Sequence, residues 1–147
     1  MFAAGLAHGV PKKPVWVFSG DGAFAMNPGM LMVERQMNLS NLKHFMVSNR
    51  VYGSTSNVPL PGRENNDDAA IARGFGIERV YSFGSMNELS AKFDEAVLES
   101  GHTFIHLEVE PLDERSKSPP MDGPEVKFRF GRYIERETGN RIFSAPL

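Results

Sequence analysis

The residues best suited to chemistry are a Gly-Asp-Gly tripeptide and an asparagine, each placed directly after an apolar run. Gly20-Asp21-Gly22 follows VWVFS, residues 15–19, and Asn49 follows HFMVS, residues 44–48. Short uninterrupted apolar runs are typical of strands that are buried on both faces of a parallel sheet. Because ligands bind at the carboxyl ends of such strands, we expect the Gly-Asp-Gly tripeptide and Asn49 to face one crevice.

The carboxylate of Asp21 creates an electrostatic conflict if this turn binds phosphate. The backbone N–H groups of Gly22 and Ala23 would meet phosphate oxygens, whereas Asp21, which we expect to face the crevice, would repel them. A divalent ion such as Mg²⁺ removes the conflict, because it takes carboxylate, amide, carbonyl and phosphate oxygens together. We expect Asp21, Asn49 and the Val51 carbonyl as its ligands. The alternative is a tight turn in which Asp21 only accepts a hydrogen bond from a neighbouring N–H.

Strand and helix patterns alternate along the first three quarters of the chain. This alternation predicts βαβ units, and the fold class we expect is α/β, a doubly wound, mostly parallel sheet with helices on both faces. The patterns place strands at 15–19, 44–48, 79–83 and 103–111, and helices at 2–9, 29–38, 67–76 and 86–100.

Three of the expected helices carry start signals. Asn27-Pro28 has the residue types of an N-cap followed by proline at the first helical position. Asp67-Asp68 suits the start of the next helix, where carboxylates are favourable. Ser85 and Glu88 have the spacing of a capping box.

Two segments lie outside the alternation and set the expected domain organisation. We expect a binding domain at residues 1–111 and a C-terminal arm at 112–147, which includes a possible amphipathic helix at 125–139. The polar, Gly/Pro-containing segment 53–66 is long for a connection, so we expect a functional or partner-contacting loop.

Composition limits the possible functions. The net charge of −2 gives no general attraction for nucleic acid or an anionic membrane, and the absence of cysteine excludes thiolate metal sites and disulfides in this chain. No apolar run approaches the roughly 20 residues that span a bilayer, so we expect a cytoplasmic protein. Of the four histidines, at positions 8, 44, 102 and 106, we expect structural roles for His44, His102 and His106.

The spacing of the two polar signals resembles a known motif. Gly20-Asp21-Gly22, then 26 residues, then Asn49 is similar to the cofactor motif of the thiamine diphosphate-dependent enzymes. The segments NRVYGSTSNVPLPG, DDAAIARGFGIERV and HTFIHLEVEP resemble the diphosphate-binding domain, or beta subunit, of sulfopyruvate and phosphonopyruvate decarboxylases. The resemblance covers roughly residues 2–111.

The resemblance implies a set of site residues. Asp21, Asn49 and the Val51 carbonyl would hold Mg²⁺. The residues expected to contact the cofactor are Gly20, Asp21, Gly22, Ala23, Phe24, Asn49, Val51 and Tyr52. Ser48 departs from the motif, because the family commonly has asparagine or aspartate there. The family's domain also begins with a further strand and a Gly-Met turn upstream of residues 2–9, which we expect to be missing here.

The resemblance further implies the function. We expect a thiamine diphosphate-binding subunit of a 2-oxo acid decarboxylase that is inactive alone, since the glutamate that activates the cofactor lies in a separate pyrimidine-binding subunit. The sequence assigns no catalytic residue and does not choose the 2-oxo acid. Two alternatives are the beta-type subunit of a 2-oxo acid:ferredoxin oxidoreductase and a truncated, non-catalytic binding or assembly module. We also expect an oligomer.

Overall fold

The computed structural model describes residues 1–112 and 121–143. They belong to two compact units, Met1–Asp113 and Glu114–Leu147, which are described separately below. The first unit contains the sheet and the candidate site. The second contains one helix and the segment that follows it.

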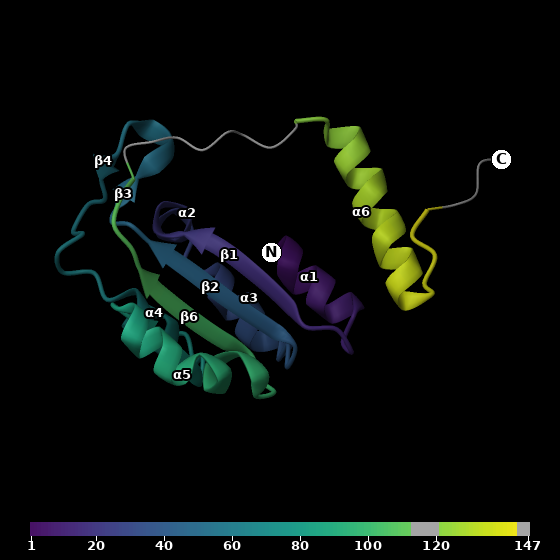
Figure 1. Ribbon diagram of the computed structural model, residues 1–147, viewed down its shortest axis with the longest axis horizontal. Coiled ribbons are helices and arrows are strands. Elements are labelled where there is room, and N and C mark those ends of the chain that lie inside the picture. Colours follow the sequence, from purple (N-terminus) through teal and green to yellow (C-terminus); the bar gives the residue numbers. More distant parts are fainter. Residues whose placement is uncertain (113–120, 144–147) are drawn as a thin grey trace. The chain divides into compact units, whose positions relative to one another are not determined.

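A four-stranded parallel sheet forms the centre of the first unit (Figure 1). Its strand order is β1-β2-β6-β5, with β1 at Val15–Gly20, β2 at Leu42–Ser48, β6 at Thr103–Glu108 and β5 at Arg79–Phe83. The expected α/β class and mostly parallel sheet are therefore confirmed. The last strand is shorter than expected, because it ends at Glu108 instead of continuing to Pro111.

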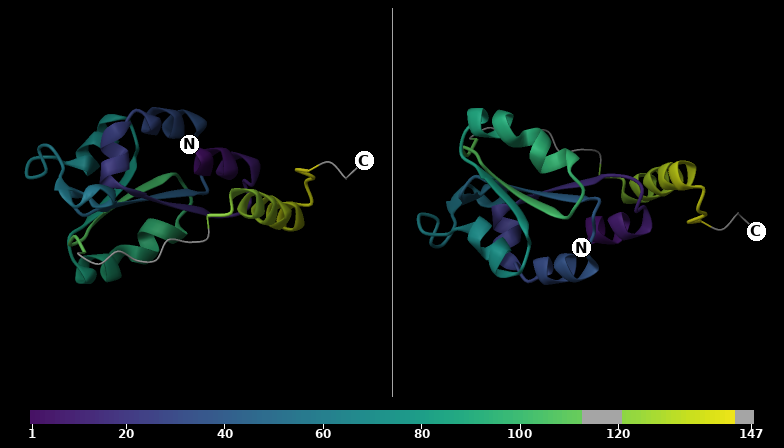
Figure 2. Two further views of the ribbon diagram at one scale, coloured as in Figure 1. Left: turned by 90° about the horizontal axis from the view of Figure 1, so that it is seen from above. Right: turned by 90° about the horizontal axis from the view of Figure 1, so that it is seen from below.

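Helix α5, Met86–Leu98, covers one face of the sheet (Figure 2). The buried residues packed there are Phe45, Phe83, Ala96, Val97 and Ile105. The predicted capping box forms: the Ser85 side chain accepts a hydrogen bond from the Glu88 N–H at 3.3 Å. The Glu88 carboxylate accepts from the Gly84 N–H at 2.8 Å.

The opposite face carries the other helices of this unit (Figure 2). These are α1 at Phe2–Gly9, α2 at Asp21–Met26, α3 at Met30–Met37 and α4 at Asp68–Gly74. Buried Phe24 and Leu31 join α2 and α3 to Met46 of β2 and Phe104 of β6. Burying such apolar side chains contributes roughly 1.5–3 kcal/mol each. The helices on this face therefore fix the position of the chain that follows β1.

The predicted N-cap role of Asn27 is wrong, whereas helix α3 lies within one residue of the expected range 29–38 at each end. Asp21–Met26 is itself helical, and Asn27, with φ −156°, is the residue that ends α2. Helix α3 begins only at Met30, with Gly29 before it and no side-chain cap. A separate short helix, α2, therefore begins at Asp21, inside the Gly-Asp-Gly tripeptide and immediately after β1. Asp67 does act as an N-cap, because its side chain accepts a hydrogen bond from Ala70 N–H at 2.8 Å.

The segment after β2 forms a small hairpin that periodicity did not predict. Strand β3, Val51–Tyr52, pairs antiparallel with β4, Val58–Pro59, and the 3₁₀ turn η1, Gly53–Thr55, lies between them. Arg50, Ser56 and Asn57 have φ values of 61°, 60° and 56°. Side chains other than glycine seldom adopt this left-handed conformation, and such residues cluster at ligand and switch regions.

In the second unit, helix α6 spans Gly123–Thr138 and contains most of the expected amphipathic segment. Gly139, with φ 72°, ends it, and Glu135 then accepts hydrogen bonds from the N–H groups of Ile142 and Phe143, both at 2.8 Å. The segment 113–120, part of the expected arm, lies outside the described residues, as does 144–147. None of the helices in the part of the chain that is described could cross a membrane.

Candidate functional site

A hollow of about 550 Å³ lies at the carboxyl ends of β1 and β2. The strand register explains why it forms there: Gly20 of β1 is level with Val47 of β2, so Asp21, which follows β1, comes beside Ser48, the last residue of β2. The lining residues that the sequence predicted as cofactor contacts are Gly20, Asp21, Gly22, Ala23, Asn49, Val51 and Tyr52. Ser54 and Thr55 of the hairpin also line the hollow.

Phe24 is the expected cofactor contact that does not line this hollow. Its side chain is 2% exposed and belongs to the core cluster beneath the sheet. Its ring centroid lies 5.8 Å from that of Phe104 on β6. Because α2 begins directly after β1, the helix turns the Phe24 side chain toward the core and leaves Ala23 on the hollow.

The Asp21 carboxylate is bound by three donors. Oδ1 accepts from the Gly22 N–H at 2.8 Å, and Oδ2 accepts from the Ser48 hydroxyl at 3.0 Å and the Arg50 N–H at 2.6 Å. Asp21 lines the hollow, as expected, but only 4% of the residue is exposed because its carboxylate is held by these donors. Buried carboxylates require such partners. The Gly22 N–H, expected as a phosphate donor, here donates to Asp21.

Asn49 and Tyr52 complete the wall on the hairpin side. The Asn49 side-chain oxygen accepts a hydrogen bond from the Val51 N–H at 3.2 Å, which holds the amide at the edge of the hollow. The Tyr52 ring lies on Gly22, where an added Cβ would come within 2.8 Å of the ring. A Cβ built on Gly20 would meet no atom within 4 Å. Gly22 is therefore required for a close approach, and Gly20 is not.

The oxygen atoms on this hollow suit a hard divalent cation that is shared with a ligand. A carboxylate, an amide oxygen and a main-chain carbonyl are the donor types that Mg²⁺ takes, and Mg²⁺ usually completes its shell with phosphate oxygens and water. The described residues contain no group of three or more His, Cys, Asp or Glu side chains that could hold a metal. A cation here would therefore depend on a bound anion for part of its coordination.

Arg50 is a site residue that the sequence did not single out. Its N–H donates to Asp21, while its guanidinium donates to the carbonyls of Arg63 and Asn66 at 3.1 and 3.0 Å. It also lines a neighbouring hollow of about 580 Å³ that shares Asn49 and Val51 with the first. No sequence signal marks an arginine for a positive φ, so the role of Arg50 is visible only in the tertiary structure.

Two buried titratable groups lie near the site. Burial raises the pKa of the Asp68 carboxyl, although His106 and Arg50 act in the opposite direction. Burial also lowers the pKa of His106. The His106 Nδ1 lies 2.8 Å from the Ser82 hydroxyl. Its Nε2 is buried and has no hydrogen-bond partner among the described residues. His106 therefore has a hydrogen-bond partner at only one of its two ring nitrogens, so a structural role accounts for only part of its side chain.

His44 and His102 have the structural roles that were expected. His44 Nδ1 and His102 Nε2 lie 3.0 and 3.1 Å from Glu34 Oε2, and His44 Nε2 lies 2.8 Å from the Ser19 hydroxyl. Burial of Glu34 raises its pKa, but the hydrogen bonds from the two histidines outweigh that effect and lower it to about 2. This network joins α3 to three other segments of the first unit.

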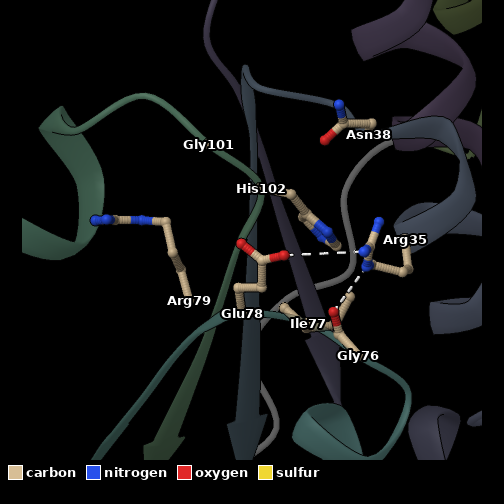
Figure 3. Close-up of a pocket in the computed structure, with 8 residues that line it drawn as sticks. All are labelled: Arg35, Asn38, Gly76, Ile77, Glu78, Arg79, Gly101 and His102. Atoms are coloured by element: carbon tan, nitrogen blue, oxygen red, sulfur yellow. Dashed lines mark hydrogen bonds and ion pairs between the residues drawn. The ribbon is translucent and has the colours of Figure 1, made fainter.

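A smaller hollow, of about 100 Å³, lies at the opposite edge, where β5 and β6 begin (Figure 3). Arg35 and Glu78 face each other across it at 3.8 Å, and Arg35 also donates to the Gly76 carbonyl at 2.8 Å. Arg79 extends away from the pair and binds Glu99 at 2.6 Å. Both arginines that line this hollow, Arg35 and Arg79, are thus paired with carboxylates, and none of the predicted cofactor residues lines it.

The fold of the first unit is similar to that of a solved thiamin diphosphate-dependent enzyme. An X-ray structure described as such an enzyme, from Mycobacterium smegmatis, matches 75% of this chain and 21% of its own chain with a TM-score of 0.62 and 26% identity. Residues 2–107 match the family model of the thiamine pyrophosphate enzyme C-terminal TPP binding domain. The chain belongs to this family.

Curated relatives narrow the comparison to decarboxylases. Sulfopyruvate decarboxylase subunit beta of Methanocaldococcus jannaschii is 30% identical over 132 residues, which are 90% of this chain and 69% of the relative. Phosphonopyruvate decarboxylase of Streptomyces hygroscopicus is 31% identical over 137 residues, 88% of this chain but 32% of the relative. The match therefore spans about a third of that relative's length.

Proposed function

We propose that this chain is the Mg²⁺-dependent thiamine diphosphate-binding subunit or domain of a 2-oxo acid decarboxylase. The observation that carries the proposal is the convergence of Asp21, Asn49 and Val51 on one hollow at the ends of β1 and β2. Asp21 is distant in the sequence from Asn49 and Val51, and together they supply carboxylate, amide and carbonyl oxygens, which are donor types that a diphosphate-bound Mg²⁺ takes. The family and the decarboxylase relatives support the same cofactor and reaction class.

The residues of this chain would hold the diphosphate end of the cofactor. Asp21, Asn49 and the Val51 carbonyl bind the cation, and the N–H groups of Gly22 and Ala23 donate to the diphosphate. Gly22 has to exchange its present bond to Asp21 for that contact. When bound, thiamine diphosphate supplies the electron sink that stabilises the carbanion left after loss of CO₂.

A second subunit and a small 2-oxo acid belong to the same proposal. The relatives from Methanocaldococcus jannaschii and Methanothermobacter thermautotrophicus are each called a beta subunit, which supports an alpha-type partner here. That partner would bind the pyrimidine ring and provide the activating glutamate. A sulfopyruvate- or phosphonopyruvate-like acid is the substrate class that the relatives favour, which makes a ferredoxin oxidoreductase subunit the weaker alternative.

Calorimetric titration with thiamine diphosphate tests this function. The full chain, with the alpha-type subunit present, should bind the cofactor in Mg²⁺ and lose at least tenfold in affinity in EDTA. Asp21→Asn should lose a similar factor, because it keeps the shape of the side chain and removes the charge that binds the cation. Asp94→Asn, an exposed position on α5, is the matched control and should bind like the wild type.

Two results would contradict the proposal. One is cofactor affinity that is the same in Mg²⁺ and in EDTA. The other is an Asp21→Asn variant that binds as tightly as the wild type. Failure of the wild type to bind at all with the partner present would instead favour a non-catalytic assembly module.

A further inference from the structure

We propose that Ser48 is a positioning residue, which fixes the Asp21 carboxylate so that Oδ1 is the single oxygen presented to a divalent cation. The inference rests on the proposed function, since it concerns the same metal site. It assigns a task to a buried hydroxyl that the proposed function leaves without one.

The hydrogen bonds divide unequally between the two carboxylate oxygens. Oδ2 accepts two, from the Ser48 hydroxyl at 3.0 Å and the Arg50 N–H at 2.6 Å, whereas Oδ1 accepts one, from the Gly22 N–H at 2.8 Å. A carboxylate oxygen offers about two lone-pair sites. Oδ2 is therefore fully used by the protein, and Oδ1 keeps a site for a ligand.

Ser48 is held rigidly enough to perform this task. It is the last residue of β2 and is 0% exposed. Its carbonyl accepts a hydrogen bond from the Val109 N–H at 2.9 Å, which ties the end of β2 to the chain leaving β6. The hydroxyl thus reaches Asp21 from a fixed backbone, and a hydrogen bond to a charged acceptor is among the stronger ones in proteins.

A substitution at Ser48 removes one of the two donors to Oδ2 and leaves the other in place. The Arg50 donor is a main-chain N–H and survives side-chain replacement, whereas the Ser48 donor is a hydroxyl that alanine removes. In Ser48→Ala, Oδ2 regains an open lone pair, so both oxygens of Asp21 become available to a cation. Ca²⁺ accepts bidentate carboxylates and irregular geometry, whereas Mg²⁺ demands a near-ideal octahedron. Loss of the hydroxyl should therefore weaken Mg²⁺ binding more than Ca²⁺ binding.

The test measures thiamine diphosphate affinity in Mg²⁺ and in Ca²⁺ for the full chain with its alpha-type partner. Ser48→Ala should weaken Mg²⁺-dependent binding about tenfold, the usual size of a lost bond to a charged group, and Ca²⁺-dependent binding about threefold or less. Ser48→Thr retains the hydroxyl and should restore the Mg²⁺ preference. Ser48→Cys has a similar volume and only a weak donor. Its ratio of affinities in Mg²⁺ and Ca²⁺ should lie between those of the wild type and Ser48→Ala.

Ser82→Ala is the matched control, because it removes a hydroxyl that bonds His106 at 2.8 Å and does not contact Asp21. It should keep the wild-type ratio of affinities in the two metals. A Ser48→Ala variant that keeps that ratio overturns the positioning role while the proposed function stands. A wild-type protein that binds no cofactor in either metal overturns the proposed function itself.

Discussion

Asp21 shows how one side chain serves both the fold and the site. Its carboxylate joins the start of α2 to the chain after β2, through the N–H groups of Gly22 and Arg50 and the Ser48 hydroxyl. Leaving buried donors without an acceptor costs about 1–3 kcal/mol. Asp21→Ala would leave all three donors without an acceptor, whereas Asp21→Asn keeps one accepting oxygen, so the asparagine variant should lose less stability.

Glu34 gives a prediction about acid stability. Its pKa is lowered from an ordinary 4.5 to about 2, because the hydrogen bonds from His102 and His44 outweigh the effect of burial. A depressed folded-state pKa means that this stabilisation is fully present above about pH 4.5 and is lost as the pH falls toward 2. The shift corresponds to roughly 3 kcal/mol.

The free energy of unfolding of Glu34→Gln should therefore be roughly 3 kcal/mol lower than that of the wild type at pH 7. The difference should narrow below pH 4.5. Urea denaturation at pH 7, 5 and 3.5 measures it. Glu78→Gln, at a side chain that is 85% exposed, is the control and should change stability by less than about 0.5 kcal/mol. Parallel pH profiles of wild type and Glu34→Gln would contradict this account.

At the scale of elements, the segment after β2 is a clamp built around Arg50. The main chain of Arg50 holds Asp21, and its guanidinium holds the Arg63 and Asn66 carbonyls at the far end of the segment 53–66. The left-handed backbone, φ 61°, is what directs the two groups of one residue to separate partners. The clamp thus connects the wall of the hollow with the start of α4.

Arg50→Gly should separate these two tasks. Glycine adopts a positive φ without strain and keeps the N–H that binds Asp21, but it removes the guanidinium. Hydrogen exchange across residues 53–66 should become faster, while Mg²⁺-dependent cofactor affinity should stay within about threefold of the wild type. Exchange in that segment that does not change would show that the guanidinium does not hold it.

At the scale of the whole molecule, the chain supplies only part of a decarboxylase site under the proposed function. The described hollow offers groups for the diphosphate end of the cofactor, and the pyrimidine-contacting glutamate is expected on a second subunit. The matched region is 69% of the beta subunit from Methanocaldococcus jannaschii, and that relative is named as one subunit of its enzyme.

The purified chain should therefore show no 2-oxo acid decarboxylation with thiamine diphosphate and Mg²⁺, and turnover should appear when the alpha-type subunit is added. CO₂ release from sulfopyruvate, phosphonopyruvate and pyruvate measures both the activity and the substrate class. A single-site variant, Asp21→Asn, in the reconstituted complex controls for contaminating enzymes. Turnover by the chain alone would refute the need for a partner.

Local sequence patterns predicted the four parallel strands, the helices α1, α3, α4 and α5, and the placement of Asp21 and Asn49 on one hollow. This is because alternating elements force parallel strands, and the carboxyl ends of parallel strands share one edge. The tertiary structure alone decided what these residues touch. Helix α2 begins at Asp21, so Asn27 ends a helix instead of starting one, and Phe24 turns into the core. The register of β1 with β2 brings Ser48 and Arg50 to the Asp21 carboxylate, and no pattern in the sequence encodes those long-range hydrogen bonds.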